Sequence, residues 1–471
     1  MGLIQFNVES DDLIVQSEIA KADFVTFDGR VIAAQSQLSN RVLSCLRGQA
    51  DSSKLRILCT LNGRHLVIQT TSLRENQMIY NLEMELARGE LSRLRNFYAL
   101  WTGAGLKSTP ELDDTIHAAH EAFRKSIFTD RQSYAAIQSI ALTHDAIDLL
   151  VLVYTSQRIA FRKQRTRRIP MFIGCRLIKP PEKSEVFLEA FNAIIVRTRW
   201  NVVEPNDGDY QWDELDSLVD WAMENGLFIL GGPLLDLSSG CFPEWMSSWK
   251  GDLLNLQSFT SDFVETVVSR YVGRIRHWEV VSGANRGGVN DLSEEQRLNL
   301  IIRAVEAAQE VDEQIQISLR VIQPWGEYLS TTENRLPPIQ FVDTLRRSGA
   351  KLSEVNIDLR FGNGDIQSLQ RDMLSVSQLL DHWSLLQLPL NVMVALPERV
   401  FGIDDDIASL VTWQADVVED LMLMCLSKER VSGFFCLNWR DDGVLDGALV
   451  GERQTIHPVV QRISQIRNDP D

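Results

Sequence analysis

The chain from about residue 169 onward repeats an apolar run followed by an amphipathic stretch. Helical spacing, with apolar residues three and four positions apart, is clearest over residues 212–226 and 293–311. Strands that are apolar along their whole length are typical of a parallel sheet covered on both faces. Eight such units predict a closed (β/α)8 barrel. The apolar runs begin near Met171, Ala193, Leu227, Ile275, Ile315, Val355, Leu390 and Gly433.

The first 75 residues have a different pattern, with apolar and polar residues in alternation. Residues 54–70 contain two alternating runs that meet at Asn62-Gly63. This dipeptide tolerates the positive φ angles of a type I′ turn, so we expect a β-hairpin here. Residues 1–75 therefore predict a small β-rich module.

Helical spacing replaces the alternation between about residue 76 and residue 168. We therefore divide the chain into a β-rich module (1–75), a helical region (76–168) and a (β/α)8 barrel (169–471). The expected fold class is α/β, a barrel preceded by a β-rich and α-helical region. The three helical stretches are residues 81–101, 111–128 and 131–162.

Charge and composition exclude several classes of partner. With 47 basic and 64 acidic side chains, the formal net charge is -17, which repels nucleic acid at long range. The N-terminus lacks a secretory signal pattern, and the most apolar run, 146–154, is too short to cross a bilayer. Six cysteines without a CxxC pair indicate reduced thiols. We expect a cytoplasmic protein with no nucleic-acid or membrane partner.

Several barrel segments resemble glycoside hydrolase family 10, the xylanase family. Residues 199–227 are similar to its second-strand segment, and residues 231–245 to its third. The run HWEVVSGAN (277–285) resembles the fourth strand, Trp-Asp-Val-Val-Asn-Glu, and GFFCLNWRDD (433–442) resembles the eighth. The resemblance extends over about 169–466. It implies a (β/α)8 barrel and, as the family's activity, retaining hydrolysis of β-1,4-xylan.

A retaining glycosidase needs two carboxyl groups about 5–5.5 Å apart. The resemblance places the acid/base position on Gly283 and the nucleophile position on Val394, and neither residue has a carboxyl group. It therefore implies a catalytically degenerate member, and we lean against enzymatic activity. The family's substrate-holding positions fall on Ile195, Val196, Arg199, Asp236 and Leu237.

Carboxylates elsewhere near the predicted strand ends leave a second hypothesis open, an active O-glycosyl hydrolase of xylan-like β-1,4-glycans with relocated catalytic groups. Its fallback candidates are Glu327, Asp358 and Glu279. The structural alternatives are an ion pair of Asp358 with Arg320 or Arg360, a loop anchor at Glu327, and a buried partner of Arg or His at Glu279. Further acidic residues near strand ends are Glu204, Asp236, Asp441 and Asp442.

Four tryptophans fall in the loops expected over the barrel mouth. Aromatic faces stack on sugar rings, but tryptophans also close barrel ends by packing, and both interpretations stay open. Together with Arg199 they form the predicted saccharide-binding set. These tryptophans are Trp200, Trp245, Trp325 and Trp439.

The histidines do not predict a metal site. His117 and His120 lie one turn apart on a predicted helix, and His144 lies on the next one, but the paired Glu-x-x-His motifs of a di-iron site are missing. The glycine turn at 361–365 is not a dinucleotide fingerprint. We therefore predict no metal and no cofactor.

The sequence as a whole favours a non-catalytic protein that binds an oligosaccharide or acts as a protein-interaction scaffold. The amphipathic N-terminal helices could mediate a homo-oligomer or bind a protein partner. A third hypothesis treats the barrel as a purely structural assembly block with a mouth filled by side chains.

Overall fold

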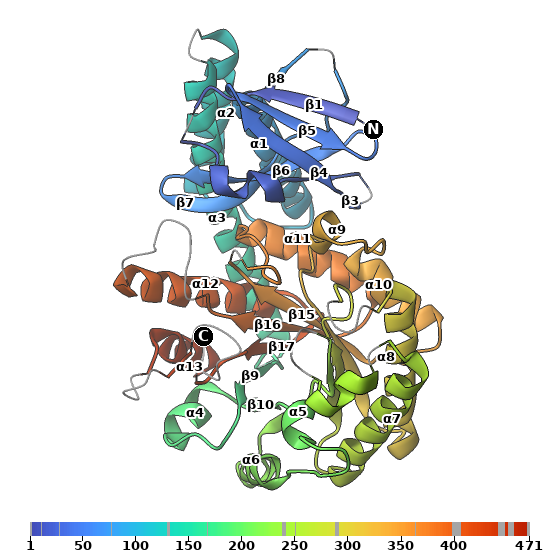
Figure 1. Ribbon diagram of the computed structural model, residues 1–471. Coiled ribbons are helices and arrows are strands. Elements are labelled where there is room, and N and C mark those ends of the chain that lie inside the picture. Colours follow the sequence, from blue (N-terminus) through green and yellow to red (C-terminus); the bar gives the residue numbers. More distant parts are fainter. Residues whose placement is uncertain are drawn as a thin grey trace. The chain divides into compact units, whose positions relative to one another are not determined.

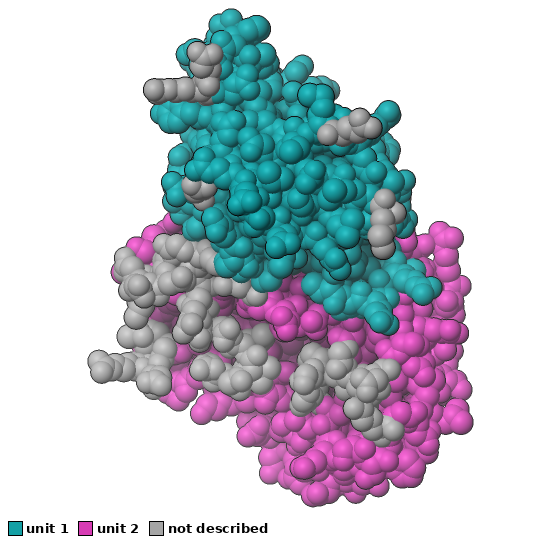
Figure 2. All heavy atoms as spheres, turned by 45° about the horizontal axis from the view of Figure 1, so that its top comes forward, with its two compact units in different colours: residues 1–169, 326–337, 368–379 teal, residues 170–325, 338–367, 380–471 magenta. Residues whose placement is uncertain are grey.

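The structure is a computed structural model and consists of two compact units (Figure 2). Unit 1 contains residues 1–169, 326–337 and 368–379, and unit 2 contains residues 170–325, 338–367 and 380–471. The structure describes residues 2–468 except 11, 28, 77, 130–131, 167, 238–241, 250, 288–291, 363, 398–406, 441–447 and 451–455.

Unit 2 is built on a closed parallel barrel, which confirms the predicted fold class (Figure 1). Each main strand pairs in parallel with the next, and β17 pairs with β9 to close the ring. All eight strands begin within two residues of the predicted starts. They are β9 (Phe172–Leu177), β10 (Ala193–Val196), β11 (Phe228–Gly231), β13 (His277–Ser282), β14 (Gln316–Val321), β15 (Glu354–Arg360), β16 (Leu390–Ala395) and β17 (Val431–Cys436). A short strand, β12 (Leu235–Asp236), pairs with the end of β13.

Helices between the strands cover the barrel, as the amphipathic stretches predict. The helix over residues 294–311 begins with a capping box, in which the Ser293 and Gln296 side chains each accept a backbone N–H from the other residue. The helices are α4 (Ser184–Ala190), α5 (Trp200–Val203), α6 (Asp213–Glu224), α7 (Leu253–Arg270), α8 (Glu294–Val311), α10 (Pro338–Arg347), α11 (Met373–Trp383), α12 (Ile407–Ser427) and α13 (Pro458–Asn468).

Part of the barrel interior is an apolar cluster centred on Phe435. A Cβ atom on Gly174 or on Gly433 would lie 2.5 Å from the Phe435 ring, so these two glycines leave the space that the ring fills. Close packing of this kind makes the barrel interior a core and not a channel. The cluster consists of Ala193, Ile195, Leu230, Met393, Ala395, Phe435 and Leu437.

Unit 1 begins with two four-stranded sheets, ordered β4-β5-β1-β8 and β3-β2-β6-β7. The predicted hairpin is confirmed, since Asn62 (φ 49°) and Gly63 (φ 76°) form a turn with both φ angles positive. The strands are β1 (Gly2–Asn7), β2 (Asp23–Val25), β3 (Val31–Ile32), β4 (Ala34–Ser39), β5 (Val42–Arg47), β6 (Lys54–Leu61), β7 (Arg64–Gln69) and β8 (Tyr80–Asn81).

Three long helices follow the sheets, at the positions that the periodicity predicts: α1 (Leu82–Gly103), α2 (Pro110–Phe128) and α3 (Gln132–Arg165). Residues from both sheets, α1 and α3 share one hydrophobic core. The predicted β-rich and helical regions are therefore packed together in one unit. Unit 1 also contains two segments from the barrel part of the sequence, of which 326–337 includes the short helix α9 (Tyr328–Thr331).

By length and composition alone, α3 could cross a membrane. Half of its most apolar window is buried inside the protein, and buried core helices commonly have such a composition. In this structure α3 packs against α1 and α2.

Candidate functional site

The carboxyl ends of the parallel strands meet at one end of the barrel, where (β/α)8 enzymes carry their active sites. Gly283 directly follows β13, and Val394 is the next-to-last residue of β16. Met393 and Ala395 belong to the cluster inside the barrel, so Val394 between them faces the other side of the strand. A shift of one position in either direction still yields no carboxyl group at the end of β16.

Glu279, the fallback candidate on β13, is fully buried. Its carboxylate lies 3.0 Å and 2.9 Å from two nitrogens of Arg320, and it accepts a hydrogen bond of 2.5 Å from the Asn356 amide. Burial raises the pKa of Glu279, while Arg320 and Asn356 act in the opposite direction. Glu279 is thus the buried partner of an arginine.

Asp358, the candidate on β15, is also buried. Arg360 donates to its two carboxylate oxygens at 2.8 Å and 2.6 Å, and Arg320 Nη1 lies 4.0 Å from Oδ2. Arg320 therefore stands between Glu279 and Asp358. Both carboxylates belong to one buried network with two arginines.

Amides extend this network along the strands. Asn356 donates to Ser318, and Asn391 donates to both Asn356 and Glu354. Glu354 lies 2.9 Å from the His277 ring. The sequence contains a signal for this polar network, because every second residue of β15 is polar. These residues are Glu354, Asn356, Asp358 and Arg360.

Glu327 lies in unit 1, whereas Asp358 lies in unit 2. Its carboxylate accepts a hydrogen bond of 3.1 Å from Arg371, another residue of unit 1. Each candidate is therefore bound by an arginine of its own unit, and Glu327 anchors the segment in which it lies.

The remaining described carboxylates near strand ends have structural contacts. Glu204 accepts hydrogen bonds from Trp200 Nε1 at 2.7 Å and from the Gly208 N–H at 2.9 Å. Asp236 lies 3.7 Å from Arg197. Asp441 and Asp442 lie outside the described residues.

The predicted saccharide-binding set divides into two groups. Trp200 stacks on Phe263 and is 3% exposed, and Trp439 packs edge-on against Phe187 and is 5% exposed. These two rings are part of the protein's packing. The half-buried members are Trp245, Trp325 and Arg199.

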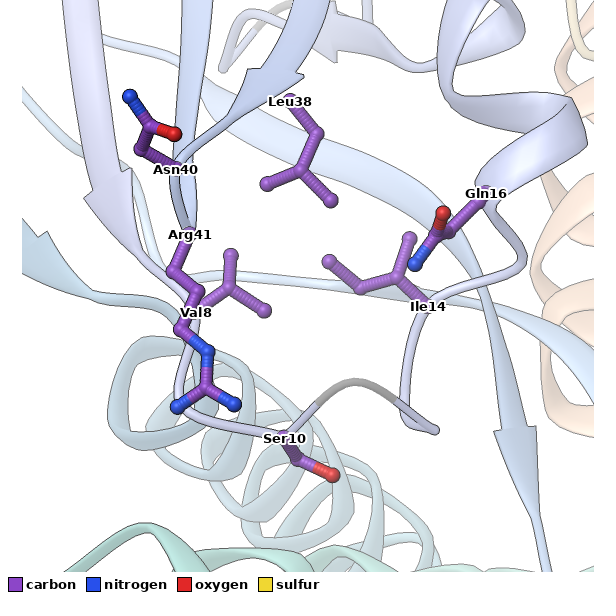
Figure 3. Close-up of a pocket in the computed structure, with 7 residues that line it drawn as sticks. All are labelled: Val8, Ser10, Ile14, Gln16, Leu38, Asn40 and Arg41. Carbon is purple, nitrogen blue, oxygen red and sulfur yellow. The ribbon is translucent and has the colours of Figure 1, made fainter.

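A pocket of about 250 Å³ lies in unit 1, where the sequence predicted no site (Figure 3). Val8, Ile14 and Leu38 form its apolar part. None of its described lining residues is an acidic residue, a histidine or a cysteine, so these residues offer contacts for a small ligand but no acid/base pair. Its polar lining residues are Ser10, Gln16, Asn40 and Arg41.

Glu90, His144 and Asp372, all buried in unit 1, have the residue types of a metal site. Arg93 Nη2 lies 2.7 Å from Glu90 and also contacts Asp372, so one guanidinium is already paired with both carboxylates. His117 and His120 lie on α2 outside this cluster. The expectation of a protein without metal stays a prediction.

Comparison with known proteins points to one family. The sequence profile "Glycosyl hydrolase family 10" matches residues 162–320. Endo-1,4-beta-xylanase B of Humicola insolens is 33% identical over 88 residues, which are 19% of this chain and 24% of that protein. Endo-1,4-beta-xylanase C of Paenibacillus barcinonensis is 24% identical over 203 residues, 41% of this chain and 18% of that protein. The chain thus spans about a quarter or less of these two relatives.

Xylanase B from Clostridium stercorarium F9 is a solved structure of similar kind, with a TM-score of 0.49 and 15% identity over 65% of this chain and 98% of that one. The barrel itself is established by its own strand pairings. The profile match and the closed parallel barrel lead to one conclusion: this chain contains a xylanase-like (β/α)8 barrel similar to glycosyl hydrolase family 10.

Proposed function

We propose that the barrel does not hydrolyse glycosides and acts as a saccharide-binding protein. The absence of hydrolysis is supported by where the carboxylates lie and by what binds them. By the resemblance, the family's catalytic positions fall on Gly283 and Val394, which have no carboxyl group, and the three fallback candidates are each bound by an arginine. Loss of essential catalytic groups typically lowers kcat by several powers of ten.

The alternative, an active hydrolase with relocated carboxylates, has one supporting observation. Burial raises the pKa of Glu279, as in a general acid that must be protonated near neutral pH. A general acid must also reach the glycosidic oxygen within about 3 Å. Glu279 is 0% exposed and is held by Arg320 and Asn356, so a substrate would have to displace buried contacts. The geometry therefore favours the non-catalytic function.

Saccharide binding is supported by the half-buried rings of Trp245 and Trp325, since partly exposed aromatic faces stack on sugars. Xylanase relatives suggest a xylan-like β-1,4-linked chain as the ligand. A cytoplasmic location is part of the proposal, because the five described cysteines are buried without a disulfide.

A turnover assay on nitrophenyl xylobioside and cellobioside tests the non-catalytic function. Nitrophenolate leaves with little help from a general acid, so these substrates detect a surviving nucleophile. We expect no release above buffer at high protein concentration. Release that disappears in Glu279→Gln or Asp358→Asn would show that the catalytic groups have moved.

Calorimetric titration with xylotetraose and cellotetraose tests the binding function. We expect binding that weakens about tenfold or more in Trp325→Ala, by loss of a stacking contact. Tyr134→Ala, a change of an exposed aromatic residue on α3 in unit 1, is the matched control and should bind like the wild type. No heat with either oligosaccharide would contradict saccharide binding.

A protein-interaction function is the second candidate, and exposed apolar side chains on the N-terminal helices favour it. Light scattering coupled to gel filtration would detect a homo-oligomer, and a Phe128→Ser variant should then shift towards the monomer. These side chains are Leu100, Ile127, Phe128, Tyr134, Leu152 and Phe161.

A further inference from the structure

A group of four buried charged or polar side chains lies inside unit 1 and is separate from the candidate site of the barrel. Glu90 and Arg93 come from α1, His144 comes from α3, and Asp372 comes from the segment 368–379. All four are at most 6% exposed. The group therefore joins two helices of the N-terminal region to a segment that lies more than 200 positions later in the sequence.

Arg93 is the centre of the group. Its Nη2 lies 2.7 Å from Glu90, and its two terminal nitrogens contact the two oxygens of Asp372, one of them at 3.1 Å. Its Nη1 also donates to the Ser375 hydroxyl at 2.8 Å. His144 lies between the same carboxylates, with Nε2 3.3 Å from Glu90 and Nδ1 3.6 Å from Asp372.

Two carboxylates and an imidazole are also the ligands of many metal ions, but the arrangement here differs from a metal site. A metal ion takes one nitrogen of an imidazole ring, whereas the two nitrogens of His144 face different carboxylates. The guanidinium of Arg93 forms a fork on Asp372 and reaches Glu90 as well. Arg93 therefore supplies the positive charge that a metal would bring.

Charge balance distinguishes the remaining possibilities. Glu90 and Asp372 bring two negative charges into the buried site, and Arg93 and the neighbouring Lys54 bring two positive charges. A divalent ion would add two further positive charges. The two basic side chains therefore balance the carboxylates without a metal.

We infer that Glu90, Arg93, His144 and Asp372 form a metal-free charge clasp, in which Arg93 and the ring of His144 hold the segment 368–379 on α1 and α3. In the chain, residues 368–372 end the connection between β15 and α11, and residues 373–379 form the first turns of α11. Connections of this kind carry function in (β/α)8 barrels. The clasp uses part of this connection as a structural element of unit 1.

Two neighbouring contacts support the clasp. The Val67 N–H of β7 donates to the Gln370 carbonyl at 2.9 Å, and Arg371 binds Glu327 at 3.1 Å. The segment 368–379 is thus attached at three consecutive residues, of which Asp372 is the one that contacts α1.

Other charged and titratable groups face the clasp from the packed elements. Lys54 of β6 lies near Arg93 and Glu90, and burial lowers its pKa. Cys59 of β6 faces Glu90. Asp148 of α3 lies near His144 and is paired with Arg64 of β7 at 2.5 Å.

Hydrogen exchange of the full chain, followed by mass spectrometry, tests the clasp. In Asp372→Asn, we expect the amides of residues 368–379 to exchange about tenfold faster or more, because a charge-assisted bidentate contact is lost. Asp343→Asn breaks the exposed ion pair with Arg347 on α10 and should leave these rates unchanged. Unchanged protection in Asp372→Asn would overturn the inference.

A milder variant and a direct readout of metal binding complete the test. Ser375→Ala removes one Arg93 contact and should accelerate the same amides to a smaller extent, even if Asp372→Asn fails to fold. Zinc titration of the chelator-treated protein should show no stoichiometric binding; one zinc per chain that is lost in His144→Gln would overturn the metal-free clasp.

Discussion

Unit 1 and the barrel each bury an arginine between two carboxylates, but they assemble these groups in different ways. In the barrel, Glu279, Arg320 and Asp358 come from three neighbouring strands, β13, β14 and β15, whose register brings them together. In unit 1, Arg93 and Asp372 are 279 positions apart in the sequence. The first network follows from strand order, and the second depends on how distant segments pack. Similar buried ion pairs can therefore form between neighbouring strands of one sheet or between segments that lie far apart in the sequence.

The largest expected effect is the loss of Arg320, because two fully buried carboxylates then lack their shared cation. We expect Arg320→Met to lower the free energy of unfolding by about 3–5 kcal/mol, measured by denaturant titration. Arg347→Met, at an exposed position on α10, is the control and should change it by about 0.5 kcal/mol or less. If the double variant Arg320→Met/Glu279→Gln regains part of the lost free energy of unfolding, the uncompensated charge of Glu279 is the cause of the loss. Wild-type stability of the single variant would show that the barrel network is dispensable.

A smaller loss is expected for Arg93→Met, since His144 remains between the two carboxylates. We expect about 2–3 kcal/mol, with faster hydrogen exchange confined to unit 1. The variants of Arg93 and Arg320 share no partner, so their effects should add within about 0.5 kcal/mol when both are monitored by global unfolding. A coupling clearly above about 1 kcal/mol would contradict the view that the two networks are independent.

The pH dependence of stability should have opposite signs in the two networks. Burial raises the pKa of Glu279, so its contribution to stability decreases as the pH rises above the ordinary value for glutamate. Burial opposes ionisation of Asp372 as well, but Arg93 and His144 outweigh it and hold the pKa of this carboxyl below its usual range. The contribution of Asp372 is therefore present above its ordinary value and is lost as the pH falls.

Denaturant titrations between pH 3 and pH 6 can separate these signs. Asp372→Asn should flatten the loss of stability towards acid, and Glu279→Gln should make that loss steeper, each by at most about 1.4 kcal/mol per pH unit. Parallel pH profiles for the two variants would refute the opposite signs.

The smallest effect is expected at His457, a half-buried residue of unit 2. Burial lowers its pKa to about 4, and its ring contacts Gln414 at 2.8 Å. Its stabilising contribution is complete above the ordinary histidine value of about 6.5 and is lost as the pH falls towards 4. The melting temperature of His457→Asn should therefore fall less than that of the wild type over this interval. His117→Asn, on the exposed face of α2, should follow the wild type, and an identical profile for His457→Asn would disprove the assignment.

Much of the fold could be predicted because its signals are local. Eight apolar runs set the eight barrel strands within two residues, and Asn62-Gly63 set the hairpin turn. The candidate site was predicted less completely. Arg320 and Arg360 were named as possible partners of Asp358, and both contact it, whereas the amide of Asn356 beside Glu279 was missed. These contacts depend on the register between neighbouring strands, and the sequence of a single strand does not determine that register.

The sequence by itself determined the (β/α)8 barrel and the three N-terminal helices. Periodicity and residue identity suffice for these features because each depends on a short stretch of chain. Only the tertiary structure decided that Glu327 lies in unit 1 with Arg371, and that Asp372 meets Arg93 and His144. Buried charges choose partners by proximity in the folded state, and that proximity arises from the packing of segments far apart in the sequence.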